Sequence, residues 1–216
     1  MIIGTLNIAH CNFSDVSKIC DFLKTFKVDT LFLQEIDVIT RRSGFINQYE
    51  TIRKRLEYKN GFFCPSFSFQ DGGEYGIAIM SKKNISKLEM INLSFYLDKE
   101  PRFAIKAEIS GIDGVVLTTH LSRDVDINRL QLLQLLNNMD SEKWIIAGDL
   151  NMGTDALEAT IKFNPKVYDY TWPTMAPEVR FDHIISNDMR RINVKTVSTD
   201  NLTDHNFVFA EVVDAL

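Results

Sequence analysis

Two polar residues follow a run of apolar residues in the segment WIIAGDLN, at positions 144–151. The apolar run is typical of a strand buried on both faces, and Gly148 lets the backbone bend or approach a neighbour closely. Asp149 and Asn151 are two apart, so their side chains point the same way on an extended chain. A carboxylate beside an amide suits a hard cation or a phosphate. The alternative is an Asx turn that caps a helix starting near Thr154.

Polar residues also stand at the ends of other predicted strands. They are Asn7, Glu35, Glu74, His120, Asp182 and the pair Asp204 and His205. Taken singly, each is more typical of a hydrogen-bonded core residue, a turn or a cap. Buried carboxylates and histidines without partners cost several kcal/mol, however, so many such places in one chain favour a shared site over unrelated turns.

The composition is that of an ordinary globular protein, with 216 residues of which 45% are hydrophobic and 25% charged. The formal net charge of −5 excludes an overall positive field for nucleic acid, although a local basic groove is compatible with it. Three cysteines without CxxC spacing argue against a disulfide framework or a structural zinc site. The N-terminus lacks the features of a signal peptide, and no run of 18 apolar residues exists. We therefore expect a cytoplasmic monomer with no transmembrane segment.

Strand-like and helix-like patterns alternate along the chain without a repeat or a linker, which predicts a single domain over residues 1–216. The predicted helices run from a cap at Ser14 to about Lys27, and over 47–58, 126–139 and 155–163. The predicted strands are 2–8, 29–34, 62–69, 75–80, 85–93, 103–109, 115–119, 144–147, 167–172, 179–186, 192–198 and 206–213. In the third helix the residues predicted to face inward are Ile127, Leu130, Leu133, Leu136 and Met139.

This order of elements predicts an α+β fold. Two β-rich halves with helices between their strands suggest two packed, mostly antiparallel sheets with helices on the outside. The result is a four-layer α/β/β/α sandwich.

Eight segments resemble, in order, the motifs of the endonuclease/exonuclease/phosphatase superfamily of metal-dependent phosphoester hydrolases. They are TLNIAH at 5–10, LFLQEID at 31–37, GGEYGIAIMSK at 72–82, EPRFAIKAEI at 100–109, TTHLS at 118–122, AGDLNM at 147–152, RFDHIIS at 180–186 and TDHNFVF at 203–209. Each motif is short, but the ordered set spans almost the whole chain. Residues 34–44 and 72–76 are most similar to the compact bacterial members. The resemblance implies a DNase I-like version of the predicted sandwich.

The resemblance also implies which residues hold the metal and the substrate. Glu35 is similar to the main ligand of a divalent cation, Mg²⁺ or alternatively Mn²⁺, and Asp204 to a residue that supports the metal or its waters. Asn7 and Asn151 correspond to residues that hold the metal and the scissile phosphate, and Asn151 also counts as catalytic. Arg102 is a weaker match to a phosphate-binding arginine.

The remaining residues have implied catalytic roles. His205 resembles the general base that activates water, and Asp182 the carboxylate that orients it. Asp149 is expected to position the nucleophile or the leaving group. His120 resembles a histidine that contacts the phosphoryl oxygens or the leaving group, with Glu74 placed to be its partner.

The implied function is hydrolysis of a phosphoester by in-line attack of a water that His205 activates, in the manner of a phosphodiesterase or nuclease. The substrate is a nucleic acid or a small phosphoester. One alternative is a phosphatase or phosphodiesterase acting on phosphoinositides or phospholipid head groups. Another is an inactive binding module of the same fold, although the full set of site residues argues against it. His183 departs from the aromatic residue common in relatives, and it either adds a polar contact to the site or faces away.

Overall fold

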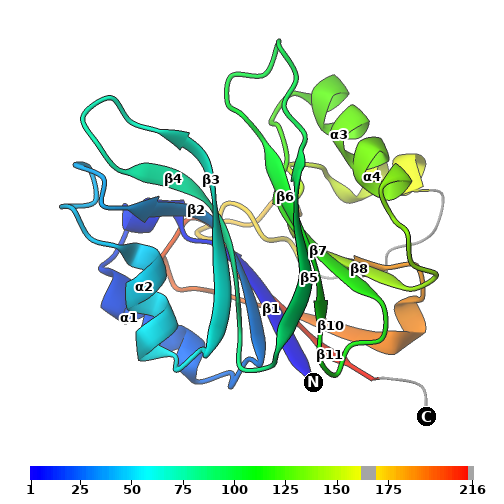
Figure 1. Cartoon of the computed structure of the whole chain (residues 1–216), viewed down its shortest axis with the longest axis horizontal. Helices are drawn as coiled ribbons and strands as arrows, with labels where there is room; N and C mark the ends of the chain where they lie inside the picture. The colour runs from blue at the N-terminus through cyan, green and yellow to red at the C-terminus, as the bar shows by residue number, and fades with distance from the viewer. Residues whose placement is uncertain (162–168, 214–216) are drawn as a thin grey trace.

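The computed structural model describes residues 1–161 and 169–213, in which two β-sheets face each other and helices cover their outer faces (Figure 1). The six-stranded sheet has the order β10-β11-β1-β2-β4-β3 and the five-stranded sheet the order β5-β6-β7-β8-β9. Only the pairs β1–β2 and β7–β8 are parallel, and the other neighbouring strands within each sheet run antiparallel. This architecture confirms the predicted α+β, four-layer sandwich.

The strands of the six-stranded sheet are β1 (Ile2–Asn7), β2 (Thr30–Val38), β3 (Asn60–Ser68), β4 (Glu74–Ser81), β10 (Ile192–Val197) and β11 (Phe207–Val212). Those of the five-stranded sheet are β5 (Ile85–Asn92), β6 (Phe103–Ile109), β7 (Val115–His120), β8 (Trp144–Asp149) and β9 (Asp182–Ser186). The helices are α1 (Val16–Lys24), α2 (Gln48–Arg55), α3 (Val125–Asn137) and α4 (Thr154–Ile161), with short 3₁₀ turns η1 (Ala9–Cys11) and η2 (Met189–Arg191). Within the described ranges, none of the helices combines the length and the apolar character that a membrane span requires.

Three apolar clusters lie between the four layers. The central cluster joins the two sheets through residues such as Phe32 and Ile145. A second packs α1 and α2 onto the six-stranded sheet, and a third packs α3 and α4 onto the five-stranded sheet. Strands buried on both faces must be apolar on both faces, which explains the apolar runs 31–33 in β2 and 144–147 in β8.

The strand directions bring the polar strand ends to one edge of the sandwich. Because β1 and β2 are parallel, Asn7 and Glu35 lie toward the same end of the six-stranded sheet. The parallel strands β7 and β8 place His120 directly beside Asp149, and the antiparallel β9 begins with Asp182 opposite Asp149.

The helices differ from the sequence predictions in their boundaries: α2, for example, ends at Arg55 rather than at 58. The cap of α1 is Asp15 rather than Ser14, because the Asp15 carboxylate accepts a 2.7 Å hydrogen bond from the Ser17 amide. The Ser14 hydroxyl instead donates to the Leu202 carbonyl at 2.8 Å. The helix ends at Lys24, before the predicted boundary at Lys27.

The buried face of α3 also differs from the prediction. Leu130 and Leu133 are exposed, whereas Asn128 and Gln131 are buried with the apolar residues Ile127, Leu132 and Leu135. The polar side chains face inward because they hold loops: Asn128 Nδ2 donates to the Asn151 carbonyl at 2.9 Å, and Gln131 Nε2 donates to the Leu93 carbonyl at 3.1 Å. A prediction that places only apolar residues on the inner face therefore assigns the wrong face of this helix to the core.

Two further predictions need correction. The strand predicted over 29–34 does not end at Glu35, because β2 continues to Val38 after a bulge. The strand predicted over 167–172 lies partly outside the described residues, and its remainder forms only an isolated bridge between Trp172 and Val179.

Candidate active site

Glu35 lies at a bulge in β2, where the register with β4 shifts between Leu33 and Ile36. Its φ angle is 57°, a left-handed conformation that is uncommon outside glycine. The bulge turns the carboxylate toward the polar strand ends, and this side chain is 12% exposed. Burial raises the pKa of Glu35, but its interactions with His10 and His120 and the hydrogen bond from Asn7 lower it overall, so the group is a carboxylate.

Asn7 connects the two sheets at the end of β1. Its Nδ2 donates to Glu35 Oε1 at 3.1 Å and to Asp149 Oδ2 at 3.0 Å. Its Oδ1 accepts the Ala9 amide at 3.0 Å, which fixes the orientation of the side chain. Asn7 therefore holds one carboxylate from each sheet at a set separation.

Asp149 ends β8 and is the central group of the site. The Asn151 amide donates to Asp149 Oδ1 at 2.9 Å. The Asx turn, which the sequence analysis gave as the alternative to a site, is therefore present as part of the site. Burial and the nearby Asp182 carboxylate raise the pKa of Asp149 to about 6. Asn151 has a φ of 47°, and its Nδ2 donates to the Leu121 carbonyl at 2.9 Å. That bond joins the segments that follow β7 and β8.

His205 lies just before β11 and bonds to a carboxylate of the opposite sheet. Its Nδ1 is 2.8 Å from Asp182 Oδ2, and its Nε2 is 3.8 Å from Asp149 Oδ2. Burial lowers the pKa of His205, but the charge and hydrogen bond of Asp182, with the charges of Asp149 and Asp204, raise it to about 10. A carboxylate on one ring nitrogen fixes the tautomer and leaves the other nitrogen free to exchange a proton.

His120 is buried beside Asp149, with Nε2 3.5 Å from Asp149 Oδ2. This nitrogen has no hydrogen-bond partner among the described residues, and the same is true of Asp182 Oδ1. Burial and the charge of Arg102 lower the pKa of His120 well below its ordinary value, so the ring is neutral. Buried polar atoms without partners call for an explanation, and a site for a charged ligand provides one.

The side chains gathered here fit a divalent cation. Carboxylate oxygens of Glu35, Asp149 and Asp182 suit a hard metal such as Mg²⁺. Ligand atoms of Asp149, Asp182 and His205 lie within 4.8 Å of one another, which is close enough to share one ion. Because His205 Nδ1 and Asp182 Oδ2 already bond to each other, Glu35 is the freer ligand.

A family model for the endonuclease/exonuclease/phosphatase family matches residues 4–205 of this chain. The chain belongs to that family. A comparison with curated proteins found no match.

Solved structures of the family share the fold over nearly the whole chain. A protein of the family from Leptotrichia buccalis is 14% identical, with 99% of this chain and 100% of that chain covered and a TM-score of 0.78. One from Bacteroides vulgatus is 17% identical, with 98% of each chain covered and a TM-score of 0.74. TDP2 from D. rerio, complexed with a single-strand DNA product, is 19% identical, with 97% of each chain covered and a TM-score of 0.65. These likenesses confirm the DNase I-like fold.

Three further predicted residues make other contacts. Asp204 Oδ2 accepts a 3.3 Å hydrogen bond from Trp172 Nε1. Arg102 is buried, pairs with Glu100 at 3.3 Å and leaves its Nε without a hydrogen bond among the described residues. Glu74 begins β4, and no hydrogen bond or ion pair to His120 is found for it in the described part of the chain.

The sequence predictions missed two cationic or titratable residues that approach Glu35. His10 Nδ1 is 3.6 Å from Glu35 Oε2, and Arg123 Nη2 is 3.8 Å from Glu35 Oε1. His10 belongs to the TLNIAH segment and lies three residues after Asn7. This closeness to a predicted site residue was the signal in the sequence that could have pointed to it. His183, in contrast, faces away from the site, because its Nε2 bonds to the Met152 carbonyl at 2.8 Å.

Proposed function

We propose that this chain is a divalent-metal-dependent phosphoester hydrolase of phosphodiesterase or nuclease type. The observation that carries the proposal is the 2.8 Å contact between His205 Nδ1 and Asp182 Oδ2, next to a second buried carboxylate, Asp149. A neutral imidazole oriented in this way can take a proton from an attacking water through Nε2. The carboxylates of Asp182 and Asp149, which raise its pKa, stabilise the imidazolium that forms when the ring takes this proton.

The neighbouring groups divide the remaining work. Asp182 orients the imidazole and stabilises the imidazolium that forms. Asp149, which is 3.8 Å from His205 Nε2, positions the water or the leaving group. His120 Nε2 and Asn151 face the phosphoryl oxygens. A phosphate there would supply the partner that His120 Nε2 lacks.

Glu35 would hold the cation, with Asn7 and Asp204 supporting it. Mg²⁺ is held by few carboxylates and keeps several waters, so one buried Glu with weaker neighbours suffices. When bound, the cation supplies positive charge that offsets the repulsion between an anionic ester and its nucleophile. Asn7 contributes by fixing Glu35 and Asp149 through its two donated hydrogen bonds.

A nucleic acid is the first substrate class to test. The TDP2 relative from D. rerio is complexed with a single-strand DNA product, and this chain has the same fold. A cavity of about 410 Å³ next to the site contains three cationic residues that could bind a second phosphate, together with three acidic ones. The cationic residues are Lys99, Arg102 and Arg123, and the acidic ones are Asp98, Glu100 and Asp124. Phosphoinositides and phospholipid head groups are the alternative substrates. The inactive-module alternative would require a defect in the site, and every proposed catalytic group is present.

The test is hydrolysis of matched phosphodiester and phosphomonoester substrates with Mg²⁺, with EDTA, and by the His205→Ala protein. We expect cleavage that EDTA abolishes and that His205→Ala reduces about 10²–10⁴-fold, the usual contribution of a general base. His183→Gln is a matched control, because His183 is a buried histidine outside the site whose bond to Met152 a glutamine can replace.

Cleavage that persists in EDTA would exclude the proposed metal dependence. Full activity of a folded His205→Ala protein would exclude the proposed base. A preference for the diester would favour nucleic acid or phospholipid over a phosphatase role.

A further inference from the structure

His10 stands in a strained turn directly after β1. Ala9, His10 and Cys11 have φ angles of 43°, 44° and 60°, so three consecutive residues other than glycine adopt the left-handed conformation. Such backbone strain persists only where surrounding contacts enforce it. It is found preferentially at functional sites.

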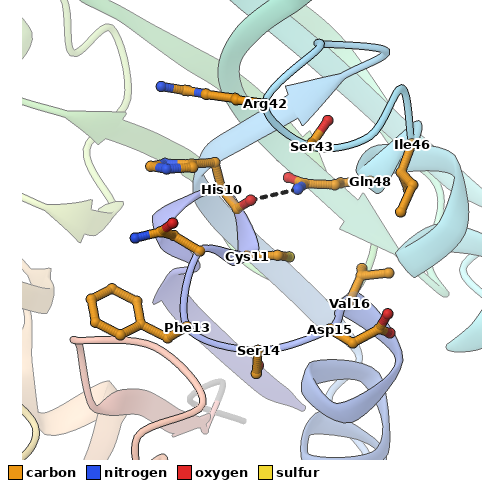
Figure 2. Close-up of a pocket in the computed structure, with 11 residues that line it drawn as sticks. His10, Cys11, Phe13, Ser14, Asp15, Val16, Arg42, Ser43, Ile46 and Gln48 are labelled. Carbon is orange, nitrogen blue, oxygen red and sulfur yellow. Dashed lines mark hydrogen bonds between the residues drawn. The ribbon is translucent and has the colours of Figure 1, made fainter.

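The contacts that enforce the turn come from both sides. The Cys11 amide donates to the Ile8 carbonyl at 2.8 Å. Gln48, a buried residue at the start of α2, donates through Nε2 to the His10 carbonyl at 2.7 Å (Figure 2). The other end of the same amide, Gln48 Oε1, accepts the Asp37 amide of β2 at 2.8 Å. The turn is therefore tied to the strand that carries Glu35.

This arrangement directs the His10 ring to Glu35. In Figure 2 the ring extends away from Gln48 and Val16 and lies on the same side as Arg42. Its Nδ1 is buried, has no hydrogen-bond partner in the described part of the chain, and is 3.6 Å from Glu35 Oε2. That separation is too long for a hydrogen bond. It fits two neighbouring ligands of one ion, because ligand atoms about 2.1 Å from a metal lie roughly 3–3.6 Å apart.

We propose that His10 Nδ1 is a ligand of the cation at Glu35, and that this nitrogen favours a first-row transition metal such as Mn²⁺ over Mg²⁺. The inference rests on the proposed function, since it requires a cation at Glu35. Mg²⁺ prefers oxygen ligands, whereas imidazole suits transition metals better; Mn²⁺ lies at the oxygen-preferring end of that series and serves as the probe. His10 would thus set which metal the site selects, a property that Glu35 alone does not provide.

The test measures Mn²⁺ and Mg²⁺ binding to the full chain without substrate, by calorimetry, and the nitrogen coupling of bound Mn²⁺ by electron spin echo spectroscopy. The test variant is His10→Asn, because asparagine tolerates the left-handed turn. We expect Mn²⁺ affinity to fall at least about 10-fold, with a smaller loss for Mg²⁺. The nitrogen coupling should disappear in His10→Asn and persist in the matched control His205→Gln.

Nitrogen coupling that survives in His10→Asn, or equal losses for both metals, would overturn the proposal. Thermal unfolding of each variant establishes that it is folded. Glu35→Gln separates this proposal from the function on which it rests. If Glu35→Gln still binds Mn²⁺ like the wild type, the metal site itself is wrong. If Glu35→Gln loses both metals while His10→Asn binds them normally, only the role of His10 is wrong.

Discussion

The two sides of the candidate site are built differently. On the side of His205, Asp182 and Asp149, the side chains are at most 4% exposed and come from regular strand ends. On the side of Glu35, the backbone is strained at both the bulge and the turn after β1, and the side chains of Glu35 and His10 are 12% and 25% exposed. One side is closed and regular, and the other is open and irregular.

This difference corresponds to two kinds of chemistry. Proton transfer depends on pKa values and on short hydrogen bonds, and both require exclusion of water and fixed geometry. Metal binding requires an entry path and ligands aimed at one point, and strained backbone can aim side chains that regular strands cannot. The closed side should therefore tolerate substitution poorly, while the open side should adjust.

The largest effect is expected from Asp182→Asn on the closed side. The amide removes the negative charge that stabilises the imidazolium and that selects the His205 tautomer, so turnover should fall about 10²–10⁴-fold. Metal affinity should change much less, because Asp182 Oδ2 is already hydrogen-bonded to His205 Nδ1. Parallel measurements of turnover and Mg²⁺ binding check both statements. A large loss of metal affinity would mean that Asp182 is a ligand and that the two sides are not separate.

The next effect concerns packing at Gly148, which has a φ of 154° and pairs with Thr119 of β7. A Cβ here would lie 2.1 Å from the Thr119 carbonyl oxygen, so Gly148→Ala must move a strand next to Asp149. We expect a loss of about 2–4 kcal/mol in the free energy of unfolding, from overpacking and backbone strain together. Urea unfolding measures it.

Gly153→Ala is the matched control for this substitution. Its Cβ would meet only Val179 Cγ1 at 3.8 Å, an ordinary contact, so stability should change little. Equal losses for the two variants would show that β8 is no more tightly packed at the site than the segment after it.

The sequence predicted most of this architecture because its signals are local. Alternating and continuous apolar runs predict the strands, and the polar residues at their ends predict a shared site. Two features have no local signal. The inward face of α3 depends on Asn128 and Gln131 bonding to distant loops, and the bulge at Glu35 depends on its pairing with β4. Both arise from contacts between segments that are far apart in the chain.

The residues of the candidate site were likewise predictable only where the signal was local. Asn7, Glu35 and Asp149 were each predicted from a strand end, and the structure joins them through the Asn7 amide. His10 was missed because a left-handed turn of three residues other than glycine has no residue signature in the sequence. The proposed partnership of Glu74 with His120 has no contact to support it, and it stays a prediction.

A smaller effect, on stability, follows from the buried His183. Burial lowers its pKa to about 4, from an ordinary value of 6.5. Between these values the unfolded chain binds a proton that the folded protein does not, so stability falls as the pH falls through this window. Protonation of this histidine in the unfolded chain should lower the free energy of unfolding by about 2 kcal/mol between pH 7 and pH 5. Urea unfolding at both pH values should show that His183→Gln loses less stability on acidification than the wild type, and equal losses would contradict the assignment.

The smallest effect tests how open the Glu35 side is. Arg123 is 75% exposed and lies 3.8 Å from Glu35 Oε1, where its charge competes with a bound cation. Arg123→Gln should therefore strengthen Mg²⁺ binding by about 0.2–1 kcal/mol, or roughly 1.4- to 5-fold, the range of an exposed ion pair. High salt should remove the gain, because exposed charges are screened. Arg190→Gln is the control, since Arg190 is also exposed but pairs with Asp188. A loss of metal affinity in Arg123→Gln, or a gain that salt does not change, would mean that Arg123 is a fixed support for Glu35 and that this side of the site is closed as well.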